Sequence, residues 1–83
     1  MDIRQLRYFL AVAEEGQVTR AAKKLNMEQP PLSRQIRMLE EELGVALFDR
    51  SGKRMTLTPA GERLRSRAEQ LLLQLGEIGR AHV

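Results

Sequence analysis

The sequence has no cysteine, no tryptophan, one histidine and only three aromatic residues in 83 positions. Without cysteine, neither a disulfide framework nor a thiolate metal site can form. The histidine, His82, is next to last, which leaves almost nothing for His-based catalysis or metal ligation. No nucleophile–base pair, carboxylate dyad or phosphate-cradling glycine loop is visible. We therefore expect no enzyme activity, no metal and no cofactor.

Long apolar runs are missing as well. The first residues, MDIRQLRYFLAVAEE, carry charges on both sides of their apolar positions, which fits neither a signal peptide nor a membrane span. A cytoplasmic location is the default expectation, with no membrane partner. A chain of 83 residues is one small domain with a modest core, which oligomerisation can supplement.

Charge is segregated along the chain, although the net charge is only +3 and the sequence pI is about 10.0. Residues 17–37 hold five basic side chains against one acidic side chain. Residues 38–49 hold four acidic side chains, and residues 50–54 hold three basic ones. For any single patch, solvation of a surface helix is the commoner explanation. The segregation, however, favours a polyanion met along one face.

Apolar residues spaced by three and four predict an amphipathic helix over residues 3–15. Asp2 is its candidate N-cap and Gly16 its natural stop. We expect Tyr8 and Phe9 in the core, because a base-stacking platform would need more aromatic residues interleaved with basic ones.

The next two helices form the most informative part of the sequence. In the first of them Ala21 and Ala22 allow a steep helix crossing, and Asn26 tolerates a left-handed turn. The second begins near Glu28 or Gln29, tolerates two prolines in its first turn and ends at Gly44. Its core stripe is predicted to be Leu32, Ile36, Leu39 and Leu43.

The remainder predicts a hairpin and a last helix. Residues 46–57 read as two short strands around a Ser51-Gly52 turn. Thr58-Pro59 then opens a helix, with threonine as N-cap. Apolar side chains follow along it at the spacing of a coiled-coil seam. The dimerisation candidates are Leu64, Ala68, Leu71, Leu72, Leu75 and Ile78, although the seam could instead pack on its own domain.

With these residues laid out, the chain resembles the N-terminal DNA-binding domain of LysR-type transcriptional regulators. The matching pieces, in order and spacing, are RQLRYFLAVAEEG, TRAAKKL, QPPLSRQIRMLEEELGVALFDR and LTPAG. The resemblance implies a mainly α fold, a winged helix-turn-helix of three helices and a two-stranded wing over residues 1–58. It also implies a linker helix for dimerisation over residues 59–83, and a C-terminal effector-binding domain that is absent from this chain.

The resemblance further implies sequence-specific binding to duplex DNA as a homodimer on an interrupted palindrome. It also implies tetramers of the full-length protein and a small-molecule inducer held by the absent domain. In the family, early residues of the recognition helix contact base edges, and the wing approaches the minor groove. The base-edge candidates carried over are Gln29, Pro30, Pro31, Ser33 and Arg34. The phosphate or minor-groove candidates are Thr19, Arg20, Lys23, Arg37, Arg50, Lys53 and Arg54.

Individual residues keep alternatives. Glu28 stands where the family often has serine or threonine; either it points away from DNA, or it accepts a hydrogen bond from a cytosine amine. Arg50 could instead pair with Asp49 or with a glutamate of the acidic run.

Two other functions remain open from the sequence alone. One is a helical dimerisation module whose basic surface meets an acidic protein. The other is a winged-helix domain of another regulator type, such as those resembling the molybdate-responsive repressors.

Overall fold

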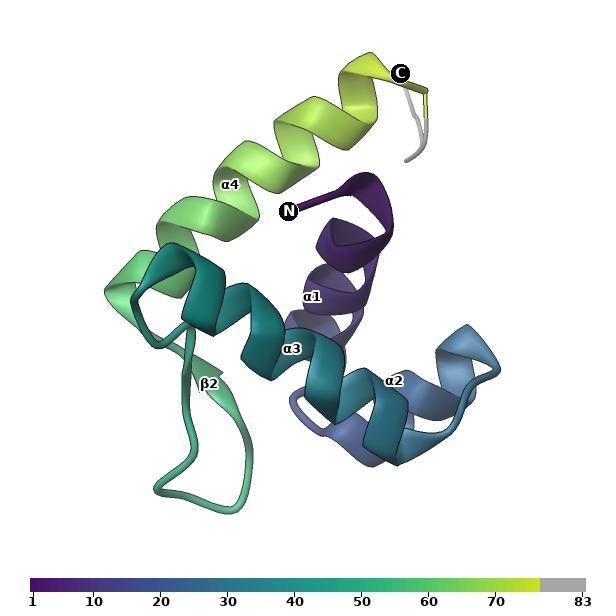
Figure 1. The fold of residues 1–83 in the computed structure, drawn as a ribbon, viewed down its shortest axis with the longest axis vertical. Coiled ribbons are helices and arrows are strands. Elements are labelled where there is room, and N and C mark those ends of the chain that lie inside the picture. The colour runs from purple at the N-terminus through teal and green to yellow at the C-terminus, as the bar shows by residue number, and fades with distance from the viewer. Residues whose placement is uncertain (77–83) are drawn as a thin grey trace.

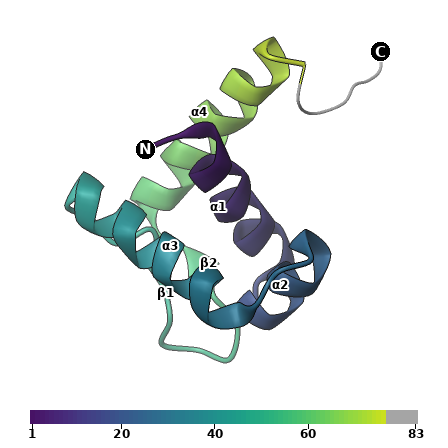
Figure 2. The same cartoon turned by 45° about the vertical axis from the view of Figure 1, so that its right-hand side comes forward.

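The computed structural model describes residues 1–76, which form four helices and one two-stranded antiparallel sheet. The elements, in chain order, are α1 (Ile3–Glu15), α2 (Val18–Leu25), α3 (Gln29–Leu43), β1 (Phe48–Asp49), β2 (Thr56–Leu57) and α4 (Pro59–Gln74). In Figures 1 and 2, α4 lies at one end of the molecule, while α2 and the loop between β1 and β2 lie at the other end. The predicted winged helix-turn-helix with a following helix is confirmed.

Local signals set the ends of α1. Asp2 accepts the backbone N–H of Gln5 at 2.8 Å, and Gln5 accepts the backbone N–H of Asp2 at 3.2 Å, which completes a capping box. Gly16 ends the helix with φ of +74°, a left-handed conformation that favours glycine. Both predicted caps are confirmed.

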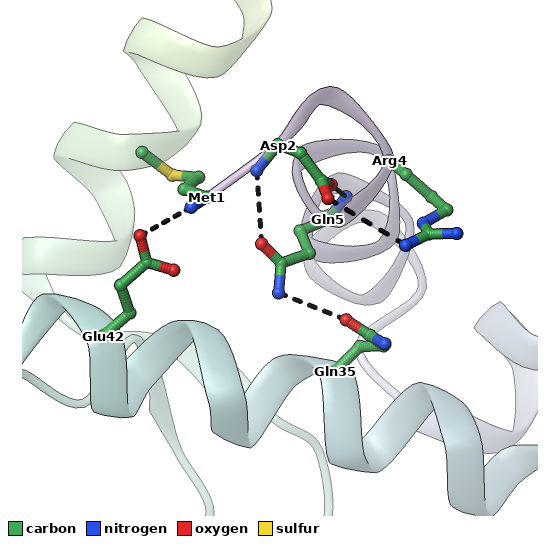
Figure 3. A network of polar contacts seen from close by, with 6 residues as sticks. All are labelled: Met1, Asp2, Arg4, Gln5, Gln35 and Glu42. Atoms are coloured by element: carbon green, nitrogen blue, oxygen red, sulfur yellow. Dashed lines mark hydrogen bonds and ion pairs between the residues drawn. The ribbon is translucent and has the colours of Figure 1, made fainter.

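The beginning of the chain is also tied to α3 (Figure 3). The Gln5 side-chain amide donates to Gln35 Oε1 at 3.2 Å, and the Met1 amino group pairs with Glu42 at 2.5 Å. Gln5 is the buried polar residue of this part of the chain, so its partner on α3 offsets the cost of burying the amide. These contacts hold the second half of α3 against the start of the chain.

The core lies where the three helices of the helix-turn-helix meet the base of the wing. The Phe9 and Phe48 rings face each other with centroids 5.4 Å apart at a tilt of 52°, a favourable aromatic geometry. Ala21 and Ala22 are buried, and Asn26 has φ of +57°, as predicted. The buried cluster is Phe9, Ala11, Val12, Ala21, Ala22, Leu32, Ile36, Leu39, Leu47 and Phe48.

The strands of the wing are two residues each, with Phe48 opposite Leu57 and Asp49 opposite Thr56. Thr58 joins the wing to α4, because its hydroxyl donates to the Ala46 carbonyl at 2.7 Å and accepts the Gly61 N–H at 3.0 Å. Thr58 is therefore the N-cap of α4, as predicted.

Gly61 explains the glycine of the LTPAG motif. A Cβ there would lie 2.2 Å from the Leu47 carbonyl oxygen and 2.9 Å from Leu57 Cδ2. Only glycine lets α4 begin this close to β1.

One feature of the predicted apolar stripes is wrong. Leu43 is 40% exposed, because it lies in the last turn of α3, beyond the part of the helix that faces the core. On α4, Ala68 and Leu72 are buried within the chain itself, on a helix that packs against α1. These two residues therefore fit the alternative in which the seam packs on its own domain. Ile78 lies outside the described residues.

Candidate nucleic-acid interface

The exposed surface at the start of α3 carries most of the predicted base-edge residues. Gln29, Pro30 and Arg34 are exposed, and Pro31 and Ser33 are half-buried. Leu32 and Ile36, on the opposite side of the same turns, are fully buried in the core. The helix is thus held by one face while the predicted reading face meets solvent.

The start of α3 has few backbone donors. Glu28 is the N-cap and its side chain makes no capping hydrogen bond. An N-cap side chain normally accepts from the second or third helical N–H, and here these positions are Pro30 and Pro31, which have no N–H. A serine or threonine in place of Glu28 would therefore find no N–H group to cap. Helix capping thus gives no reason to prefer serine or threonine at this position.

Gln29 is oriented by its neighbour on α2. The Thr19 hydroxyl donates to Gln29 Oε1 at 3.1 Å. The Gln29 NH₂ group keeps both of its donors, and Oε1 keeps its second lone pair. This bond joins two predicted DNA contacts, one from each helix of the helix-turn-helix.

Basic side chains flank the reading face. Arg34 and Arg37 on α3, and Arg20 and Lys23 on α2, are exposed and make no ion pair or hydrogen bond within residues 1–76. Lys24 differs, because it pairs with Glu14 and with Glu15, the latter at 3.6 Å. The hydrogen bond and charge of Glu14 raise the pKa of Lys24 above its ordinary value, so this lysine is engaged with α1.

The wing cations fall into two kinds. Arg50 pairs with both carboxylate oxygens of Glu40 at 3.3 Å, the second of the alternatives predicted for it. Arg54 donates to the Glu15 carbonyl at 3.1 Å. Lys53 has no hydrogen bond or ion pair in the described part of the chain.

The wing turn has its own internal support. Asp49 accepts hydrogen bonds from the Ser51 hydroxyl at 2.7 Å and from the Ser51 N–H at 2.9 Å. These two bonds, the hydroxyl first, hold the pKa of Asp49 below its ordinary value. Asp49 is thus occupied in forming the turn rather than in pairing with Arg50.

Sequence reasoning missed the role of Glu40. Its carboxylate accepts the backbone N–H groups of Leu47 at 2.8 Å and Phe48 at 3.2 Å in addition to Arg50. In the sequence Glu40 is one of three consecutive glutamates, and nothing local separates it from the other two. Its 13% exposure becomes apparent only once the wing is folded back on α3.

The described residues also bear on metal sites and membrane spans. Residues 1–76 contain no group of three or more histidine, cysteine, aspartate or glutamate side chains placed to hold a metal ion. None of the helices in this part of the chain is long and apolar enough to cross a membrane.

Comparison with known proteins identifies relatives of the whole fold. Residues 3–62 match the family model described as bacterial regulatory helix-turn-helix protein, lysR family. The chain is 60% identical to the HTH-type transcriptional regulator BsdA of Bacillus subtilis (strain 168) over 73 residues, which are 87% of this chain and 25% of BsdA. It is 51% identical over all 83 residues to TfdS of Cupriavidus pinatubonensis, covering 27% of that regulator. The chain thus spans about a quarter of the length of these two relatives.

Solved structures give the same result. The crystal structure of the BenM_DBD/benA site 1 DNA complex superposes with a TM-score of 0.89 at 48% identity, covering 93% of this chain and 86% of that one. The CbnR_DBD–DNA complex gives a TM-score of 0.86 at 46% identity, covering 92% and 87% of the two chains. The chain belongs to the lysR family of bacterial regulatory helix-turn-helix proteins.

Proposed function

We propose that this chain is the sequence-specific, double-stranded DNA-binding domain of a transcriptional regulator, with α3 in the major groove and the wing beside it. The observation that carries the proposal is the exposed reading face at the start of α3, held from behind by Leu32 and Ile36. Two relatives of this fold at 46–48% identity were solved as DNA complexes, and BsdA and TfdS are named as transcriptional regulators.

Each residue type on this face fits a contact with DNA. Gln29 pairs bidentately with adenine N6 and N7, and Arg34 with guanine O6 and N7. Ser33 is short and contacts a base edge or phosphate only when the helix lies deep in the groove. Pro30 and Pro31 offer apolar surface to a thymine methyl group. Arg37, one turn further along α3, clamps a phosphate.

Phosphate also meets the start of α2. Gln17 gives this helix no side-chain cap, so its first backbone N–H groups remain available to an anion. Arg20 and Lys23 are exposed around them, whereas the Thr19 hydroxyl is already donated to Gln29. Positioning by α2 and reading by α3 together fit the division of labour between phosphate and base contacts.

The chain acts as a homodimer through α4 in this proposal, with residues 1–58 as the DNA-binding unit and residues 59–83 as the linker helix. Leu71 and Leu75, one turn apart on the same face of α4, are 46% and 59% exposed, and this apolar surface suits a partner helix. Two such units would place two α3 helices on half-sites related by two-fold symmetry.

The test is Arg34→Ala, with Arg67→Ala as the matched control. Arg67 is also exposed but lies on α4, so the control removes the same charge far from the reading face. Fluorescence anisotropy with a duplex selected from a randomised library should show a loss of about 1–3 kcal/mol for Arg34→Ala. The preference over a shuffled duplex should fall as well. Equal effects of the two variants would place the reading face elsewhere.

A further inference from the structure

The first arm of the wing, residues 47–50, is bound to α3 through one carboxylate. Glu40 lies on α3, about 16 Å along the helix from Gln29 by the standard rise per residue. Its carboxylate accepts hydrogen bonds from two consecutive backbone N–H groups, those of Leu47 and Phe48, and from both terminal nitrogens of Arg50. A bidentate arginine–carboxylate pair fixes the plane of the guanidinium group as well as its distance. The first arm therefore has a defined position relative to α3.

The second arm of the wing, residues 54–57, is bound to the end of α1. Arg54 donates to the Glu15 carbonyl, one of the last carbonyls of the helix, at 3.1 Å. The next residue, Met55, donates its backbone N–H to the Gly16 carbonyl at 2.8 Å. The Arg54 guanidinium covers Gly16 so closely that a Cβ there would lie 2.5 Å from its terminal nitrogen. A cation at a helix C-terminus is also favourably placed in the field of the helix.

These contacts separate the three cations of the wing by what they face. Arg50 and Arg54 are directed at the protein body, one on each arm. Lys53 is exposed and has no such partner within residues 1–76. A cation already neutralised by a carboxylate releases few counterions when DNA binds, whereas an unpaired lysine at phosphate releases its share.

We propose that Arg50 and Arg54 are positioning residues that fix the wing relative to α3, and that Lys53 is the wing cation that contacts the DNA phosphate. This inference rests on the proposed function. It replaces the expectation that all three cations meet DNA, and it gives Glu40 a role in DNA binding without any contact with DNA.

The salt dependence of binding separates the two roles. Each phosphate contact contributes about 0.9 to the slope of log Kobs against log salt concentration. Lys53→Gln should therefore lower the slope by about 0.9 per bound chain, on a selected duplex and on a shuffled one. In the Lys53→Gln background, Arg50→Gln and Arg54→Gln should leave the slope unchanged, because a residue that only positions the wing has no phosphate contact of its own to lose. A further drop of about 0.9 for either arginine variant in that background would overturn its assignment as a positioning residue.

A double-mutant cycle tests whether Arg50 acts through Glu40. Arg50→Gln should weaken binding in the unmodified chain and have little further effect in Glu40→Gln, because the pair is already broken. Glu41→Gln is the matched control, since it removes the same charge from the neighbouring residue, whose side chain is exposed and makes no hydrogen bond or ion pair within residues 1–76. An equal effect of Arg50→Gln in both backgrounds would show that Arg50 meets DNA directly.

Amide hydrogen exchange of the free chain provides a readout without DNA. Glu40→Gln should speed exchange at Leu47 and Phe48, whereas Glu41→Gln should not. Equal protection in the two variants would overturn the role of Glu40. Failure of the proposed function would be distinct from both results, because the unmodified chain would then show no preference for the selected duplex.

Discussion

Truncation of two adjacent leucines of α4 should have opposite effects on the stability of one chain and on its assembly with a second. Leu72 is 1% exposed and Leu71 is 46% exposed in the single chain, although both belong to the same apolar stretch. Truncating each to alanine removes the same atoms. The structure therefore assigns Leu72 to the core of one chain and leaves Leu71 available to a second chain.

The cost of Leu72→Ala follows from its surroundings. Truncation of a buried leucine costs about 2–5 kcal/mol, depending on how much of the vacated space remains empty. Leu72 borders a surface hollow that it shares with Leu10 and Ala11, so water can enter the space and the lower half of this range is expected. For a domain whose stability is roughly 4–12 kcal/mol by its length, the loss is large.

Leu71→Ala should behave differently. As a half-exposed surface residue it should change the stability of the monomer by only about 0.5 kcal/mol. If it lies in the dimer interface, it should weaken self-association, which sedimentation velocity measures across a concentration series. Leu72→Ala should lower the urea midpoint at every concentration, whereas Leu71→Ala should lower it only where the chain is dimeric. A larger loss for Leu71→Ala at concentrations where the chain is monomeric would refute the assignment.

Three further predictions concern the wing and the reading face. Gly61→Ala forces the start of α4 away from the wing and should lower the free energy of unfolding, measured by chemical denaturation, by about 1–3 kcal/mol. Thr19→Val removes the hydroxyl that orients Gln29, so the binding free energy measured by anisotropy should weaken by about 1 kcal/mol. The loss should be confined to duplexes that carry the preferred adenine. An equal loss on all duplexes would indicate a phosphate contact instead. Ser51→Ala removes the main cause of the lowered pKa of Asp49, so an NMR titration should show that pKa rising toward its ordinary value. Because the folded-state pKa is lowered, the turn's contribution is present at neutral pH and is lost as acid protonates Asp49.

The ends of the elements could be predicted because their signals are local. Asp2, Gly16, Asn26 and Thr58 each act on backbone groups a few residues away, so the sequence shows both partners of the interaction. The helix-turn-helix was predictable for the same reason, since its small residues, turn and prolines are close together in the chain.

The contacts that position the wing could be predicted only in part, because their partners are distant in sequence. Pairing of Arg50 with a glutamate of the acidic run was one predicted alternative, but Glu40 could not be singled out, and the Arg54–Glu15 contact was not predicted. Glu40 and Arg50 are ten residues apart, and Arg54 and Glu15 are 39 apart. Both depend on how the hairpin folds back on the helices. A run of three glutamates gives no indication of which one faces inward.

The apolar stripes failed where one residue decides the face of a helix. Neighbouring residues on a helix differ by about 100° in direction, so Leu71 and Leu72 lie on different faces although both fit a loose apolar seam. The seam predicted from spacing continued from Ala68 to Leu71, whereas the chain's own core uses Ala68 and Leu72. Spacing alone does not say whether a stripe packs within one chain or between two.

The central claim is that this chain reads DNA sequence through α3. Selection of bound duplexes from a randomised library, at two salt concentrations, tests it most directly. The account predicts enrichment of an interrupted palindrome whose half-sites lie one or more helical turns apart, about 10–10.5 base pairs for each turn, with weaker retention at the higher salt. Uniform, salt-sensitive retention without any enriched sequence would contradict it, because the basic surface would then bind only the DNA backbone.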